Sequence, residues 1–67
     1  MTVFVHKDAY DIEENTSVYD FISLVLKNEG TGIALAVNEN IIPKDKWISF
    51  ILKENDTLLI IKAVAGG

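Results

Sequence analysis

The pattern of apolar and polar positions predicts a hairpin at the start of the chain. Residues 2–6 are rich in β-branched and aromatic side chains, which is typical of a strand. A short turn is predicted at 7–9. Residues 10–13 then alternate between apolar and polar side chains, as half-buried strands do. We expect the two segments to pair.

A single amphipathic helix is predicted next. Ser17 and Asp20 fit a capping box, in which the serine oxygen accepts a free amide hydrogen of the first helical turn. Lys27 falls in the last turn, and Gly30 with Gly32 can end the helix. We place the helix at 18–28. Its apolar stripe recurs at helical spacing: Val18, Phe21, Ile22, Val25 and Leu26.

The second half of the chain returns to strand patterns. Residues 33–37 are apolar throughout, which predicts a buried, central strand. A turn at 38–40 leads to Ile41 and Ile42, and 43–47 forms a tight turn that begins with Pro43 and is anchored by Trp47. Residues 48–52 fit either a short strand or an irregular edge. The last strand is predicted at 57–64.

These elements predict one domain of the α+β class over residues 1–67, because 67 residues leave no room for a second core. The order β-β-α-β-(β)-β, with one helix, predicts a mixed sheet with that helix packed on one face. The first and last strands are strongly apolar, so we expect them to lie side by side, parallel, near the centre.

Composition excludes several function classes. Ten acidic residues against six lysines, with no arginine, give a net charge of −4, which disfavours nucleic-acid binding. Cysteine is absent, so no thiolate nucleophile or cysteine metal site can form. The longest apolar run, 58–61, is too short to span a bilayer, and no signal segment is evident. We expect a cytoplasmic protein with no nucleic-acid or membrane partner.

The isolated candidates for chemistry have plainer interpretations. His6 ends a strand without a predictable second ligand or a positioned partner, so we read it as an ordinary strand-end residue. Asp11, Glu13 and Glu14 form an acidic cluster, which we read as a solvated edge, because a catalytic carboxylate pair needs a cleft that such a small domain rarely has.

The last strand carries more apolar side chains than one helix can cover. Residues 58–61 place two large apolar residues on each face of the sheet. We expect one parity under the helix, together with the first strand: Val3, Val5, Leu58 and Ile60. The other parity is predicted to form a partner-binding surface on the uncovered face: Phe4, Leu59 and Ile61. Simple alternation would put Lys62 on the core side, so we expect the strand to have left the sheet there.

The chain ends on two glycines directly after a strand. A segment without side chains can enter a narrow active site in extended form and present a terminal carboxylate there. That carboxylate is a poor electrophile until it is joined to a good leaving group such as AMP. We expect Val64 to be the last residue anchored by packing, and the tail Ala65, Gly66 and Gly67 to be extended and mobile.

In this order and spacing, the motifs resemble one family over essentially the whole chain: the ThiS-type sulfur carriers of thiamine biosynthesis, within the ThiS/MoaD group of ubiquitin-like, β-grasp proteins. The similarity rests on five motifs: Ser17-Val18-x-Asp20, Leu35-Ala36-Val37-Asn38, Ile42-Pro43-x-x-x-Trp47, Asp56 before the last strand, and Val64-x-Gly66-Gly67.

Two departures from the family pattern are visible. Asn55 stands where the family usually has glycine, and asparagine tolerates the same left-handed turn. Lys62-Ala63 stand where the molybdopterin relatives usually carry two prolines, and this chain is shorter. Both of these last observations favour the thiamine branch.

The resemblance implies a protein co-substrate rather than an enzyme, with no cofactor or metal of its own. A ubiquitin-activating-like adenylating enzyme of the ThiF type, using ATP and magnesium, would convert the Gly67 carboxylate to an acyl-adenylate. A sulfur donor, such as a cysteine desulfurase system, would replace AMP and leave a thiocarboxylate. Thiazole synthase of the ThiG type would take that sulfur for the thiazole of thiamine. Three alternatives remain open: a molybdopterin-type carrier, a ubiquitin-like modifier attached to lysines, and a non-covalent interaction module.

Overall fold

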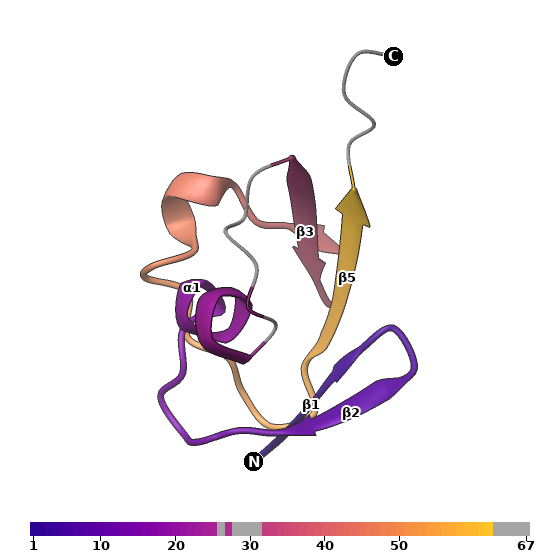
Figure 1. Cartoon of the computed structure of the whole chain (residues 1–67), viewed down its shortest axis with the longest axis vertical. Coiled ribbons are helices and arrows are strands. Elements are labelled where there is room, and N and C mark those ends of the chain that lie inside the picture. Colours follow the sequence, from indigo (N-terminus) through magenta and orange to yellow (C-terminus); the bar gives the residue numbers. More distant parts are fainter. Residues whose placement is uncertain (26, 28–31, 63–67) are drawn as a thin grey trace.

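The computed structural model describes residues 1–25, 27 and 32–62, and within them the chain forms a mixed five-stranded sheet with one helical segment packed on one face (Figure 1). The strand order is β2-β1-β5-β3-β4. The strands are β1 (Thr2–Val5), β2 (Asp8–Asp11), β3 (Ile33–Val37), β4 (Asn40–Ile41) and β5 (Thr57–Lys62). This arrangement confirms the predicted α+β, β-grasp architecture.

The predicted pairing of the first and last strands is confirmed. β1 and β5 are adjacent and parallel, with Val5 opposite Leu58. β5 occupies the middle of the sheet, and β3 pairs with its other side in antiparallel register. The bounds of β3 are those predicted, and three of its five residues are buried.

The helix begins where expected but ends earlier than predicted. α1 (Val18–Asp20) is capped by Ser17, whose Oγ accepts a hydrogen bond of 3.0 Å from the Asp20 amide. It continues as a π-helical turn, η1 (Phe21–Val25). Lys27 has a φ of 55°, outside the helical region, so the predicted extent of 18–28 is wrong at its C-terminal end. Leu26, Gly30 and the rest of 28–31 lie outside the described residues.

The wider π turn also changes which side chains face the core. Val18, Phe21 and Ile22 are buried as the apolar stripe predicted. Val25, predicted on the same stripe, is 39% exposed. Hydrogen bonding from i to i+5 puts more residues into each turn than the α-helical spacing assumes, so the stripe is lost after Ile22.

One hydrophobic core lies between the helical layer and the sheet. Phe21 belongs to this core and meets Tyr10 edge to face, with ring centroids 5.5 Å apart. The fully buried side chains of this core come from β1, the helical segment, β3, β5 and the segment before β5: Val3, Val18, Phe21, Ile22, Leu35, Leu52 and Leu58.

The first hairpin is tighter than predicted. β1 ends at Val5, and a two-residue turn, His6-Lys7, leads directly into β2. The predicted turn at 7–9 therefore begins one residue too late, and the predicted second strand at 10–13 begins two residues too late. His6 adopts a φ of 56°, a conformation uncommon for residues other than glycine, and without Gly or Asn at 6–7 the usual sequence signal for a two-residue turn is missing.

The prediction that the last strand leaves the sheet before Lys62 is wrong. Lys62 remains in the sheet, opposite Ile33, whereas we expected the strand to have left by then. Its side chain is nevertheless exposed, because the pair lies at the rim where β5 ends and β3 begins. Residues 63 and 64, also predicted as strand, lie outside the described residues.

The segment between β4 and β5 is mostly irregular. After Pro43 it forms a single 3₁₀ turn, η2 (Lys44–Lys46). Trp47 is buried as the predicted anchor, and its Nε1 donates to the Ile42 carbonyl at 2.9 Å. In 48–52, only an isolated bridge between Ile51 and Ser17 is strand-like, so the irregular alternative holds. Across residues 1–25, 27 and 32–62, no helix is long and apolar enough to cross a membrane.

Candidate docking face and chain end

The uncovered face of the sheet carries the apolar side chains that were predicted to bind a partner. Leu59 and Ile61 are 45% and 47% exposed, while Leu58, which precedes them, is fully buried. Phe4 is half-buried and lies opposite Thr57 of β5, two residues before Leu59, so it shares their face. The predicted core side is also found: Val3, Val5 and Leu58 are buried, and Ile60 packs against the core.

Cross-strand register extends this face beyond the predicted residues. Leu59 lies opposite Ala36, which lies opposite Ile41 of β4. Side chains that face each other across neighbouring strands lie on the same side of the sheet, so the three form one row. Ile61 and Ala34 form the next row. We call this surface the docking face: Phe4, Ala34, Ala36, Ile41, Leu59 and Ile61.

Ile41 is the largest of the three members of the docking face that were not predicted from the sequence, and it is 64% exposed. A signal was available, because a two-residue turn at Asn38-Glu39 puts Ile41 opposite Ala36. Both turn residues have positive φ, 50° and 74°. The predicted turn at 38–40 is one residue too long, because Asn40 already belongs to β4, and one residue of slip in this pairing would send Ile41 to the other face.

A polar clamp ties this turn to the start of β5. The Asn38 Nδ2 donates to Asp56 Oδ1 at 2.9 Å, and the Asn38 Oδ1 accepts from the Thr57 amide at 3.0 Å. Asp56 Oδ2 also accepts from the Lys53 amide at 2.8 Å. Asn38 and Asp56 both belong to the motifs that carried the resemblance, and their contact explains why the two occur together.

β5 joins the docking face to the chain end. Its last residue, Lys62, directly follows Ile61, and five residues follow Lys62, the last of them Gly67. Five residues in extended form reach at most about 17 Å. The predicted tail, Ala65 to Gly67, and the predicted anchor Val64 lie outside the described residues.

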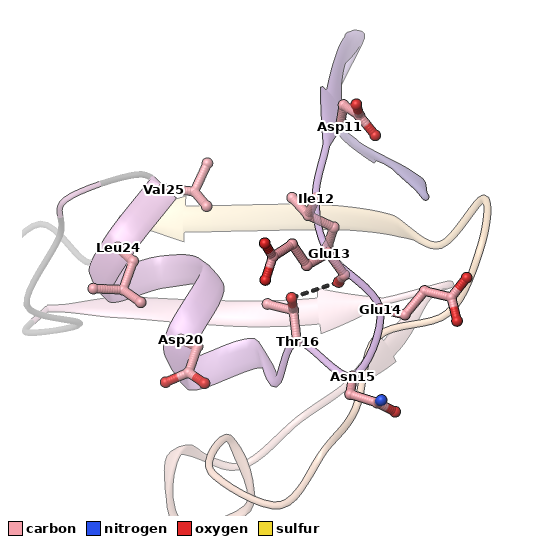
Figure 2. Close-up of a pocket in the computed structure, with 9 residues that line it drawn as sticks. All are labelled: Asp11, Ile12, Glu13, Glu14, Asn15, Thr16, Asp20, Leu24 and Val25. Atoms are coloured by element: carbon pink, nitrogen blue, oxygen red, sulfur yellow. Dashed lines mark hydrogen bonds between the residues drawn. The ribbon is translucent and has the colours of Figure 1, made fainter.

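The other candidate residues do not form a catalytic site. His6 is exposed in the first turn, and Trp47 is buried, which fits an anchor and not a ligand platform. Asp11, Glu13 and Glu14 border an open hollow beside the helix (Figure 2). In the part of the chain that the structure describes, no group of three or more His, Cys, Asp or Glu side chains could hold a metal ion.

A comparison with protein families shows to which family this small β-grasp domain belongs. The model of the ThiS family matches residues 3–67. The chain belongs to the ThiS family. The resemblance drawn from the sequence motifs is thus confirmed at the level of the family.

Two relatives of known name are similar over their whole length. The sulfur carrier protein ThiS of Escherichia coli (strain K12) is 27% identical over 67 residues, which cover 100% of both chains. The crystal structure of the thiamine biosynthesis protein ThiS from Geobacter metallireducens superposes with a TM-score of 0.85 over 100% of both chains, at 14% identity. At that identity the second likeness shows the fold alone.

Proposed function

We propose that this ThiS-family chain is a sulfur carrier for the thiazole of thiamine and that it carries sulfur at the C-terminal carboxylate of Gly67. The observation that carries the proposal is that the diglycine follows β5 after only three residues of sequence. A partner that covers Leu59 and Ile61 on β5 therefore has the C-terminal tail within reach. The absence of cysteine adds support, since the carboxylate then becomes the natural place for covalently bound sulfur. The named Escherichia coli relative is a sulfur carrier protein.

The proposed chemistry has two steps. A Gly67 carboxylate oxygen attacks the α-phosphorus of ATP, and the bond to pyrophosphate breaks, which leaves an acyl-adenylate. A sulfide-level sulfur nucleophile then attacks the carbonyl carbon, and AMP leaves with its electron pair. The product is a thiocarboxylate. Both intermediates hydrolyse in water, so we expect the steps to occur inside a partner's closed site.

The chain itself contributes docking and delivery, while the partner contributes catalysis. The proposed partners are a ThiF-type adenylating enzyme that uses ATP and magnesium, a sulfur donor such as a cysteine desulfurase system, and a ThiG-type thiazole synthase. The docking face supplies exposed Leu59 and Ile61 at its centre. Large apolar side chains of this kind give a protein interface its hot spots when a partner covers them.

The two glycines allow the tail to fit a narrow partner active site. Gly66 passes the narrowest part of that site in extended form, where a Cβ would clash. Deleting Gly67 moves the carboxylate back by about 3.5 Å. A displacement of even 1 Å can cost on the order of 100-fold in rate.

The test is a reconstituted reaction with the cognate adenylating enzyme, ATP, magnesium and sulfide, read as intact mass. We expect the wild-type chain to exchange one oxygen for one sulfur. Gly66→Val and the Gly67 deletion should fold normally and stay unmodified. Asp8→Val, on exposed β2, is the matched control: Asp8 lies opposite Val5 and so on the other side of the sheet from the docking face, and the variant should react at the wild-type rate.

Three outcomes would refute the proposal. If either tail variant gained sulfur at near the wild-type rate, delivery through the diglycine would be wrong. If the wild-type product were instead a stable amide with a lysine of another protein, the chain would be a ubiquitin-like modifier. Full function without Gly66 and Gly67 would indicate a non-covalent module.

A further inference from the structure

A second surface lies on the helical side of the molecule, away from the docking face. An open hollow of about 390 Å³ separates the segment that follows β2 from the helical turn η1. Its apolar part comes from Ile12, Leu24 and Val25. Leu24 is 72% exposed, the highest exposure of any large apolar side chain in the described residues. Figure 2 shows Leu24 and Val25 on the helix, with β-strands behind it.

Four carboxylates surround this apolar patch: Asp11, Glu13, Glu14 and Asp20. They are four of the ten acidic residues of the chain, and no lysine is among the lining residues. Figure 2 shows the Glu13 side chain reaching from the connecting segment toward the helix. All four residues line the same hollow, so its rim carries negative charge on several sides.

These charges are almost uncompensated in the described residues. Only Asp11 has an ion pair there, with the N-terminal amino group at 3.5 Å, and its side chain is 93% exposed. An exposed pair of this kind contributes little. A cation that entered the hollow would relieve the mutual repulsion of the carboxylates, while an anion would be repelled.

We propose that this hollow is a second docking site, which takes a segment of a partner protein that carries lysine or arginine beside a large apolar side chain. The cation matches the four carboxylates, and the apolar side chain covers Leu24 and Val25, which otherwise remain in water. A bare metal ion fits less well, because no group of three or more suitable ligands converges among the described residues.

The position of the hollow gives the proposal its functional meaning. η1 covers the face of the sheet opposite to Leu59 and Ile61, so one partner can hold the docking face while another holds the hollow. The carrier could then be handed from one protein to the next without first being released. This site is independent of the chemistry at Gly67, and its test involves no sulfur transfer.

The test is a titration of isotope-labelled protein with a defined probe, followed by amide chemical shifts. The probe is the acetylated and amidated hexapeptide KLKKLK, with ELEELE and KGKKGK as controls for charge and for apolar content. We expect KLKKLK to shift residues 11–16 and 20–25, and to bind at least about fivefold more weakly when salt is raised from about 0.02 M to about 0.2 M.

Variants separate the two parts of the site. Leu24→Ser and the double variant Glu13→Gln/Glu14→Gln should each weaken KLKKLK at least about fivefold. Ile48→Ser is the matched control, because Ile48 is 71% exposed and lies outside the hollow, so it should leave binding unchanged. The proposal is overturned if KLKKLK does not bind, if KGKKGK binds equally well, or if the shifts fall mainly on β5.

Discussion

The clamp between Asn38 and Asp56 gives the sharpest test of how this fold is held together. Asp56 is only 8% exposed and accepts two hydrogen bonds, from the Asn38 side chain and from the Lys53 amide. Asp56→Ala removes both acceptors and leaves two donors without these partners. The same change removes one of the links between the β3–β4 turn and the start of β5, while the hydrogen bonds between Asn38 and Thr57 remain.

The magnitude follows from these contacts. A hydrogen bond to a charged group contributes about 1.5 to 3 kcal/mol, and the part-buried setting favours the lower end for each. Two of them near that lower end give an expected loss of roughly 3 to 4 kcal/mol in the free energy of unfolding. A 67-residue domain has roughly 3 to 10 kcal/mol in total. Asp56→Ala should therefore take away a large fraction of the stability.

Asn38 allows the hydrogen bonds to be separated from the backbone conformation. Asn38→Gly loses the side-chain bonds but accepts the φ of 50° freely, whereas Asn38→Ala loses the bonds and is strained as well. We expect Ala to be less stable than Gly by about 1 kcal/mol.

The assay is urea unfolding of each variant, followed by circular dichroism and by Trp47 fluorescence. Asp8→Asn is the matched control, because Asp8 is exposed on the edge strand β2, and it should change stability by less than about 0.5 kcal/mol. The double variant Asn38→Ala/Asp56→Ala should show a coupling of at least about 0.5 kcal/mol. Loss of less than about 1 kcal/mol in Asp56→Ala, or additive effects in the double variant, would refute the clamp.

Three further predictions concern the docking face, the helix cap and the core. Ile61→Asp should weaken binding to the adenylating enzyme by more than about 2 kcal/mol, measured by calorimetry, with little loss of stability. Ile48→Asp should leave this binding unchanged, and unfolding of Ile61→Asp would contradict the assigned face. Ser17→Ala should lower the free energy of unfolding by about 1 kcal/mol, since it removes the acceptor for the Asp20 amide, and an unchanged urea midpoint would contradict the cap. Leu58→Ala should cost about 2 to 5 kcal/mol by urea unfolding, against less than about 1 kcal/mol for half-exposed Leu59→Ala, and equal losses would contradict the strand's parity.

Much of the fold could be predicted because its strands obey simple rules. Residues 33–37 are apolar at every position, which left no ambiguity about a buried strand. The alternation along β5 gave the two faces of the sheet, so Leu58 and Leu59 could be assigned to opposite sides. These patterns depend only on the two-residue period of a strand.

The errors fall where the backbone leaves the standard conformations. His6 and Lys27 both adopt positive φ, at 56° and 55°. A histidine or a lysine in a sequence is not enough to predict this backbone conformation, as a glycine would be. The π-helical turn after Asp20 could not be foreseen, because the spacing of Val18, Phe21 and Ile22 fits an ordinary α-helix. In each case tertiary packing overrides the local preference.

The candidate site shows the same division. Phe4, Leu59 and Ile61 could be selected from alternation, since a single helix leaves one face of the sheet uncovered. Ile41 could not be added without the register between β3 and β4. The contact between Asn38 and Asp56 joins residues 18 positions apart, and only the fold brings them together.

The central claim is that sulfur is carried on Gly67, and fragment mass spectrometry after the reconstituted reaction tests it most directly. The protein is incubated with the cognate adenylating enzyme, ATP, magnesium and sulfide, then fragmented along the chain. We predict that the exchange of oxygen for sulfur appears in every fragment that contains Gly67 and in none that ends before it. Sulfur found on any other residue, or no sulfur on a chain that the enzyme has bound and supplied with ATP, would contradict the account.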